Sequence, residues 1–373
     1  MNVARIDSQT EFQQLGTEWS ALQQHAATSV FQTWEWQFQW WKHYGAGRSL
    51  YLLIVRNPQS ELLGVLPLYM ERTAVLPGCS VRMLRMIGTG GDTTPDYLDA
   101  VVAPGPEQAA AYALLLGYLR DHQEEWDCLR LSDLADTSPF VTAARNWNGA
   151  ARWKWQEQIA ARISFLTLPA TWDEYLGALG RDRRYTIRSL RKKFLALPGA
   201  RFFTWEAGRD IDAAFSRLAA LHHARWEPKG EDHAFSSDAY NGFHLDVMRA
   251  CHARGWLRIH CMELADEIIA MYYCYAWRGT TYYFQGGFDP RHERLRPGLS
   301  LMGYAIEQAI AEGQQHFDML RGEYEYKKQW ARETRVTLLR VCHRPGLATS
   351  LYRMRLHALP RVKRSIKSLL GRA

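Results

Sequence analysis

The sequence predicts an α+β or α/β fold with two similar lobes, each a mixed, mostly antiparallel sheet flanked by helices. Three observations support this. The chain has 373 residues, about twice the commonest domain size. Hydrophobic residues make up 47% of it and aromatic residues 13%, enough to fill two cores without metals or disulfides. The same order of expected elements also occurs twice along the chain.

In the first half, aromatic-rich helical sequence is followed by two apolar runs separated by the turn residues 57–60, which indicates a β-hairpin. An extended stretch, a helix and a short buried strand come next. The expected elements are residues 31–44, 50–56, 62–71, 96–102, 107–122 and 126–131.

The second half repeats this order, with a hairpin that turns at Ala265 and Asp266 and a helix that ends at Gly313. These elements are residues 257–264, 267–277, 281–288, 299–312 and 316–320. Between the halves we expect a strand at 162–168, a capping box at Thr171 to Glu174, and helices at 183–195, 211–225 and 237–253. The predicted boundaries are 1–155 and 156–343 for the lobes and 344–373 for a basic tail.

The net charge of +7 is concentrated at one end of the chain. Residues 344–373 contain eight Lys or Arg and no acid, so the rest is near −1. A chain-wide basic surface for duplex nucleic acid is therefore not expected. The six cysteines form no CxxC pair and predict buried free thiols. No apolar run has the length of a signal peptide or membrane span, which predicts a cytoplasmic protein.

The tail spaces its apolar residues by three or four positions and places Lys and Arg between them. Such a strip fits the anionic surface of a membrane, which would put the protein on the inner face as a peripheral protein. Packing on the body of the protein is the alternative. The apolar positions are Leu347, Leu351, Met354, Val362, Ile366 and Leu369.

A helix beginning after Arg296 and Pro297 is the first candidate for binding chemistry. Proline suits a first helical turn, and Gly298 lets an anion approach the backbone. The amides of Leu299, Ser300 and Leu301, with the positive end of the helix dipole and Arg296, would hold a phosphate. An ordinary helix start is the alternative.

Residues 284–330 resemble the BioF2-like (CelD-type) acetyltransferase domain of the Gcn5-related N-acetyltransferase (GNAT) superfamily. The resemblance rests on Arg296-Pro-Gly298, Phe317-Asp318, and Gly322-x-Glu-x-x-Tyr326-Lys327 with Trp330. It implies tandem GNAT-like lobes, as in the Fem-type peptidoglycan aminoacyltransferases. It also implies acetyl-CoA or another acyl-CoA as co-substrate in the second lobe, without a metal. The second glycine that is usual in the family's phosphate loop is absent here.

The polar residues after the last strand of the motif are the candidate catalytic groups. Acyl transfer needs a base for the attacking amine or hydroxyl and an acid for the leaving group. We assign Asp318 or Glu323 as base, Tyr326 as acid, and Lys327 as the group that neutralises a phosphate or oxyanion. The alternatives are a turn-capping Asp318, a solvated Lys327 and a tyrosine that packs inward.

Arg184, Arg188 and Arg191 have the spacing of one basic helical stripe. The stripe would hold an anionic acceptor, a CoA phosphate or RNA, or it is a solvated face. Tyr185 and Phe194 alone offer rings for base stacking, which weighs against RNA. No metal site is expected from His222, His223, Glu227 and His233, because adjacent histidines diverge on a helix.

Together these features predict an acyltransferase that acts on an amine or hydroxyl. A polysaccharide or cell-envelope precursor as the acceptor is implied by the family alone. The alternatives are a Fem-type transferase that uses aminoacyl-tRNA and a non-catalytic scaffold with a GNAT fold.

Overall fold

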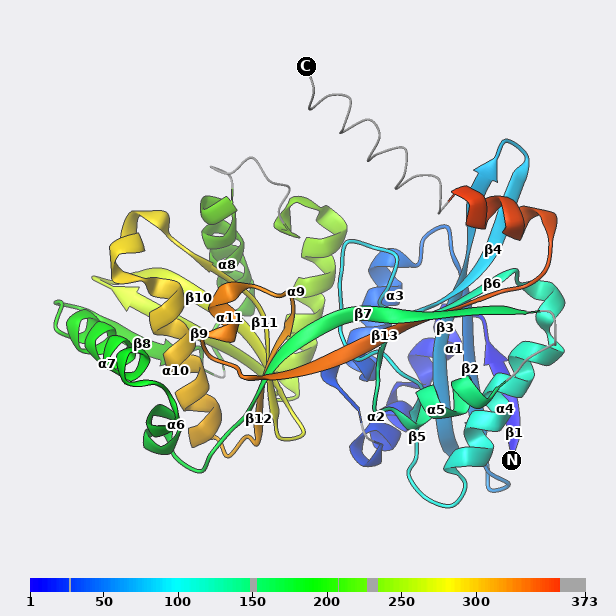
Figure 1. Ribbon diagram of the computed structural model, residues 1–373, viewed down its shortest axis with the longest axis horizontal. Coiled ribbons are helices and arrows are strands. Elements are labelled where there is room, and N and C mark those ends of the chain that lie inside the picture. Colours follow the sequence, from blue (N-terminus) through cyan, green and yellow to red (C-terminus); the bar gives the residue numbers. More distant parts are fainter. Residues whose placement is uncertain (27, 148–152, 207, 227–233, 356–373) are drawn as a thin grey trace. The chain divides into compact units, whose positions relative to one another are not determined.

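The computed structural model describes residues 1–26, 28–147, 153–206, 208–226 and 234–355 (Figure 1). The chain forms two compact units. Unit 1 contains residues 1–160 and the chain from 337 onward, and unit 2 contains residues 161–336. The chain therefore leaves unit 1, builds unit 2 and returns. We predicted that residues 337–343 lie in the second lobe, but they pair with a strand of unit 1.

Unit 1 has the sheet order β1-β2-β3-β4-β6-β13, and β5 pairs with β3. Its strands are β1 (Asn2–Ile6), β2 (Ser49–Arg56), β3 (Leu62–Leu76), β4 (Cys79–Met86), β5 (Val101–Val102), β6 (Cys128–Ala135) and the end of β13 (Glu333–His343). Its helices are α1 (Gln9–Gln14), α2 (Gly16–His25), α3 (Trp34–Tyr44), α4 (Gln108–Asp121) and α5 (Pro139–Asn146).

Unit 2 has the sheet order β7-β12-β11-β10-β9-β8. Its strands are the end of β7 (Lys154–Thr167), β8 (Arg201–Thr204), β9 (Leu257–Leu264), β10 (Glu267–Trp277), β11 (Thr280–Phe288) and β12 (His316–Arg321). Its helices are α6 (Trp172–Ala178), α7 (Arg181–Leu195), α8 (Ile211–Trp226), α9 (Asp238–Ala253), α10 (Pro297–Ala311) and α11 (Glu325–Lys328).

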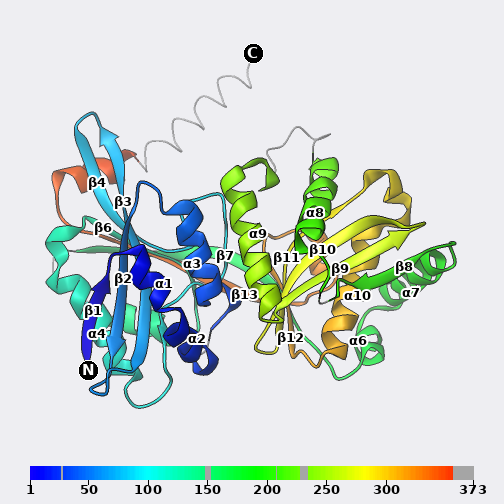
Figure 2. The same cartoon turned by 180° about the vertical axis from the view of Figure 1, so that it is seen from behind.

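The helices of unit 2 cover both faces of its sheet. Two adjacent glycines of β11 show the two faces, because successive strand residues point to opposite sides. A Cβ on Gly286 would meet the ring of Tyr272, whereas a Cβ on Gly287 would lie 2.4 Å from the backbone nitrogen of His222 in α8. Helices α6, α7 and α10 share one buried core with the Tyr272 face. Figure 2 shows α8 and α9 on the other face.

The local predictions explain much of this architecture. The Thr171 side chain accepts the amide of Glu174 and caps α6, which is one of the two bonds of the predicted capping box. The β9–β10 hairpin turns at Ala265 and Asp266, both with left-handed backbone (φ 49° and 65°), the geometry of a two-residue hairpin. The stretch 96–102 was wrongly expected to be extended throughout, because only Val101–Val102 pair as a strand.

The cysteines in the described part of the chain are free, and all except the half-buried Cys79 are buried. No helix among the described residues is long and apolar enough to cross a membrane. Within the same residues, no group of His, Cys, Asp and Glu has the arrangement of a metal site. Glu227 and His233 lie outside the described residues.

The beginning of the tail does not form the continuous apolar strip that we predicted. Residues 347–355 are helical, and Leu351 packs with Ala348 and Tyr352 on a buried cluster of unit 1. Leu347 and Met354 remain exposed. The other predicted positions, Val362, Ile366 and Leu369, lie outside the described residues.

Candidate active site

Two neighbouring parallel strands of unit 2 separate after a short region of pairing. Residues 280–282 of β11 pair with residues 316–318 of β12, after which the ladder between the two strands ends. Both strands continue, β11 to Phe288 and β12 to Arg321. Helix α10 follows β11 and helix α11 follows β12. Ligands of open α/β sheets bind beyond the carboxyl ends of such strands.

The first turn of α10 differs from the predicted phosphate cradle. The amides of Leu299 and Ser300 both donate to the Arg296 carbonyl, at 3.0 Å each, and Leu301 is buried in the core. These three amides are therefore not the free donors that we expected. Pro297 has no amide hydrogen. At this helix start, the amide of Gly298 has no acceptor among the described residues.

Two arginines bring positive charge to this helix start. Arg296 is exposed and has left-handed backbone (φ 50°). Arg183 of α7 lies over the ring of Trp330 at 4.7 Å, and its Nη1 donates to Gln329 at 2.8 Å. Its Nε and Nη2 are buried with no acceptor among the described residues. Burial lowers the pKa of Arg183, and the charge of Arg296 lowers it further. A bound anion would satisfy both guanidinium groups.

A chain of tyrosines connects the α10 start with α11. The Tyr272 hydroxyl donates to the Gly298 carbonyl at 2.6 Å. Tyr272 and Tyr283 have ring centroids 4.6 Å apart and share a hydrogen bond, and Tyr283 shares another with Tyr326. Burial raises the pKa of Tyr326, although the nearby Arg225 opposes this shift. Tyr326 is therefore protonated at neutral pH, and with 37% of its surface exposed it is a hydroxyl donor within reach of a ligand.

Asp318 does not have the surroundings of a general base. Its side chain is fully buried, and Oδ1 accepts the amide of Leu320 at 2.8 Å. Leu320 has left-handed backbone (φ 56°) at a point where the β12–β7 ladder changes register. Asp318 thus stabilises this irregular turn of β12, the capping role that was its alternative in the sequence.

Lys327 is also a structural residue in this arrangement. Its Nζ is buried and donates to the carbonyls of Met319, Leu320 and Arg321 at 2.6, 3.0 and 2.6 Å. An ammonium has three hydrogens, and these three contacts use all of them. The predicted contact of Lys327 with a phosphate or oxyanion is therefore wrong. Instead, Lys327 binds the end of β12 where no strand pairs with it on the β11 side.

Glu323 is exposed in the segment between β12 and α11. The preceding Gly322 has a φ of +105°, which lets the chain turn sharply away from β12. Of the two carboxylates proposed as base, Glu323 is the one that solvent and a ligand can reach. Its catalytic role remains a prediction.

The predicted basic stripe on α7 divides between two faces of the helix. Arg184 and Arg188 lie on the outer face with Lys192 and the exposed Tyr185. Arg188 pairs with Asp173 at 3.2 Å. Arg191 instead points inward and forms an ion pair with Glu307 of α10.

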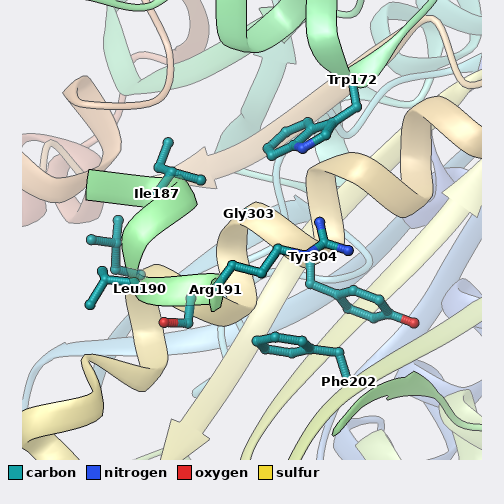
Figure 3. A pocket seen from close by; sticks show the side chains of 9 residues that line it. Trp172, Ile187, Leu190, Arg191, Phe202, Gly303 and Tyr304 are labelled. Atoms are coloured by element: carbon teal, nitrogen blue, oxygen red, sulfur yellow. The ribbon is translucent and has the colours of Figure 1, made fainter. Parts of the chain in front are cut away.

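Figure 3 shows Arg191 extending from α7 into the space between Trp172 and Tyr304. The residues around it, including Phe202, Leu299 and Ser300, line a small cavity beside the first turns of α10. Leu299 and Ser300 thus face the protein interior near this cavity. Arg191 is separate from the surface on which Arg184 and Arg188 lie.

The sequence analysis did not single out Arg183, Tyr272 or Tyr283. Arg183 resembled its basic neighbours, and its ring partner Trp330 and the nearby Arg296 are more than 110 positions away. The alternation Tyr-x-Tyr in 324–326 was the one signal for a tyrosine cluster.

Comparisons with known proteins identify the family that this part of the chain resembles and the fold that the chain shares. Residues 181–328, which include α7, α10 and α11, match the family model of an acetyltransferase (GNAT) domain. The structure is similar to a crystal structure of FemX, with 13% identity, a TM-score of 0.64, and coverage of 95% of this chain and 99% of FemX. No curated protein matches the sequence.

Two further solved structures have the same fold. One is the C-terminal domain of a putative lysylphosphatidylglycerol synthetase from Agrobacterium fabrum, with 9% identity, a TM-score of 0.55, and coverage of 93% and 95%. The other is L-PGS from Bacillus licheniformis, with 9% identity, a TM-score of 0.54, and coverage of 90% and 94%. The predicted mixed α+β fold and the resemblance to GNAT and Fem-type architecture are therefore confirmed.

Proposed function

We propose that the protein transfers an acyl group from an acyl-CoA thioester to an amine or hydroxyl, because residues 181–328 match the family model of an acetyltransferase (GNAT) domain. One observation carries the proposal beyond the family. Arg183 and Arg296 bring two positive charges to the start of α10, and two buried nitrogens of Arg183 have no acceptor in the described part of the chain. The diphosphate of CoA is a ligand with the matching charge.

The thioester would lie beyond the diverging ends of β11 and β12, near the Tyr326 hydroxyl. The acceptor attacks the carbonyl carbon, a C–N or C–O bond forms, and the C–S bond breaks. Glu323, directly or through water, takes the proton of the acceptor. Tyr326 donates a hydrogen bond and a proton to the departing sulfur and regains its proton from solvent.

A polysaccharide or cell-envelope precursor is our proposed acceptor, and the cytoplasm our proposed compartment. The acceptor rests on the resemblance to the BioF2-like and Fem-type proteins, and the compartment is the one that the sequence analysis leads us to expect. Whichever precursor is the acceptor, it must present a free amine or hydroxyl next to Glu323.

Calorimetric titration with acetyl-CoA and CoA tests the donor site. We expect saturable binding, with affinity reduced at least tenfold in Arg183→Gln and in Arg296→Gln. Arg184→Gln is the matched control, since this neighbouring arginine lies on the outer face of α7. Lack of binding to the wild-type protein, or equal losses in all three variants, would contradict the proposal.

An aminoacyl-tRNA donor is the second candidate. The outer face of α7 supports it, because Arg184, Arg188 and Lys192 surround Tyr185, whose ring is 73% exposed. A competition assay separates the two donors. Displacement of acetyl-CoA by tRNA, with loss of that effect in Arg184→Gln/Arg188→Gln, would favour the tRNA donor. Transfer from acetyl-CoA in ribonuclease-treated protein would favour the CoA donor.

A further inference from the structure

The long hairpin of unit 1 has a partner in the chain after β13. Arg355 Nη1 donates to the carbonyls of Ala74 and Val75, at 3.0 and 3.3 Å, near the end of β3. Figure 1 shows the helical segment 347–355 lying across the β3–β4 hairpin. The side chains buried between them are Val75, Val81, Met83 and Cys128 from unit 1 and, partly, Ala348, Leu351 and Tyr352 from the helical segment.

Large apolar side chains remain exposed beside this packed cluster. Leu76 is 54% exposed at the hairpin tip, Met354 is 66% exposed and Leu347 is 78% exposed. Leu347 and Met354 are seven residues apart, so they lie on the same side of a helix two turns long. The bonds from Arg355 to Ala74 and Val75 hold this end of the helical segment against the end of β3, where Leu76 lies. Exposed apolar groups gathered in this way indicate an interaction surface.

The two segments that carry these side chains contain basic residues but no acid. Residues 72–80 and 344–355 contain four arginines and no acid. Residues 356–373, which lie outside the described part, add five Lys or Arg and again no acid. The four arginines are Arg72, Arg344, Arg353 and Arg355.

We propose that this basic apolar edge, made of residues 72–80 and 344–355, docks on a membrane surface that contains anionic lipids. Leu76, Leu347 and Met354 enter the boundary between headgroups and acyl chains, and the positive charge of the two segments attracts lipid phosphates. Apolar insertion and electrostatic attraction act together in such contacts. The one-sided charge favours an anionic bilayer over a second copy of this chain, because two copies of the edge would repel each other.

Vesicle sedimentation with the full chain tests the proposal. Vesicles of phosphatidylglycerol mixed with phosphatidylcholine are compared with phosphatidylcholine alone. We expect binding to the anionic vesicles that weakens as salt increases. Replacing Leu76, Leu347 and Met354 by Ser should reduce the partition coefficient at least tenfold. These side chains are already exposed, so the variant should fold normally, which its thermal unfolding checks.

The matched control replaces three exposed apolar residues of unit 2, Tyr185, Leu195 and Leu197, by Ser. This variant should bind vesicles like the wild-type protein. Unchanged binding of the Leu76/Leu347/Met354 variant, an equal loss in the control, or no binding to anionic vesicles would overturn the proposal. A dimer in lipid-free solution that the same variant abolishes would instead assign the edge to self-association. None of these results depends on transferase activity.

Discussion

Units 1 and 2 share a run of three strands, a helix and a further strand, apart from the short β5 of unit 1, but the corresponding helices begin with opposite charge. Helix α4 of unit 1 has Glu107 at its N-cap, after Gly105 and Pro106, whereas α10 of unit 2 has Arg296 there, before Pro297. A carboxylate at a helix start occupies the place that suits an anion, and a guanidinium attracts one. Matching topology therefore does not make both units equivalent as phosphate sites.

The ends of the parallel strands also differ between the units. In unit 1, residues 83–85 of β4 pair with residues 128–130 of β6. This parallel ladder is as short as the ladder between β11 and β12 of unit 2. The chain after β4 then packs back on its own unit, since the Tyr69 hydroxyl donates to the Thr89 carbonyl at 2.6 Å and a Cβ on Gly88 would lie 3.2 Å from the Pro95 side chain. In unit 2, α10 and α11 follow the corresponding strands, and Lys327 binds the end of β12.

The largest effect is expected from Lys327→Met, which leaves three buried carbonyls without their donor. We expect unit 2 to lose about 3 to 5 kcal/mol of unfolding free energy. Denaturant unfolding measures it. The neighbouring Lys328 pairs with Glu325 at the surface, so Lys328→Met should change the stability by less than about 0.5 kcal/mol. If Lys327→Met removes activity but leaves stability intact, the structural role of Lys327 is wrong and this residue contacts a ligand instead.

Tyr326→Phe tests whether chemistry belongs to unit 2. Removing the hydroxyl should lower kcat about 100-fold with little change in KM, because the donor acts on the leaving group. Tyr324→Phe is the control, since its ring stacks on Tyr326 with centroids 5.9 Å apart and its hydroxyl is not part of the tyrosine chain. Full activity in Tyr326→Phe would remove this residue from the mechanism.

Charge reversal at the two helix starts should have a smaller effect. Arg296→Glu should weaken CoA binding about 10- to 30-fold, since a favourable charge becomes a repulsive one. Glu107→Arg should leave CoA affinity unchanged, because the unit 1 helix does not contribute to the donor site. Titration calorimetry measures both. Gain of a second CoA site in Glu107→Arg would show that charge alone separates the two units.

The two units should also respond to pH in opposite directions. Burial raises the pKa of Asp99 in unit 1 to about 7, so its folded state holds a proton that the unfolded state releases above pH 4. The contribution of Asp99 to the free energy of unfolding is complete below about pH 4 and decreases as pH rises to about 7. Burial lowers the pKa of His260 in unit 2 to about 3. Its contribution is complete above about pH 6.5 and decreases as pH falls toward 3.

Each group should change stability by at most about 1.4 kcal/mol per pH unit within its window. Thermal unfolding between pH 4 and 7 should show this in two variants. Asp99→Asn should remove the loss on raising pH, and His260→Gln should remove the loss on lowering it. Parallel pH profiles of the two variants would contradict the opposite signs.

The sequence predicts the features that local chemistry determines. The cap at Thr171, the turn at Ala265 and Asp266, and the order of strands and helices all follow from residues close together in the chain. Side-chain partners are harder to predict. The roles of Asp318 and Lys327 depend on the left-handed backbone of Leu320. A leucine in the sequence does not predict this backbone conformation.

Long-range contacts explain the remaining differences. Arg183 and Arg191 look alike in a basic helix, yet one meets Trp330 and the other meets Glu307. Which way each arginine points depends on how α7 packs against α10. The periodicity of α7 alone is compatible with several basic helix faces and does not select the one that packs against α10.

The return of the chain to unit 1 has a consequence for synthesis on the ribosome. All strands of unit 2 have been made once residue 336 is translated, but the sheet of unit 1 lacks its β13 partner for β6 until residue 343 has followed. Unit 1, whose synthesis begins first, is thus the unit whose sheet is completed last. During translation its β6 edge stays open for pairing, and a nascent chain halted before β13 would present that edge to chaperones or to aggregation.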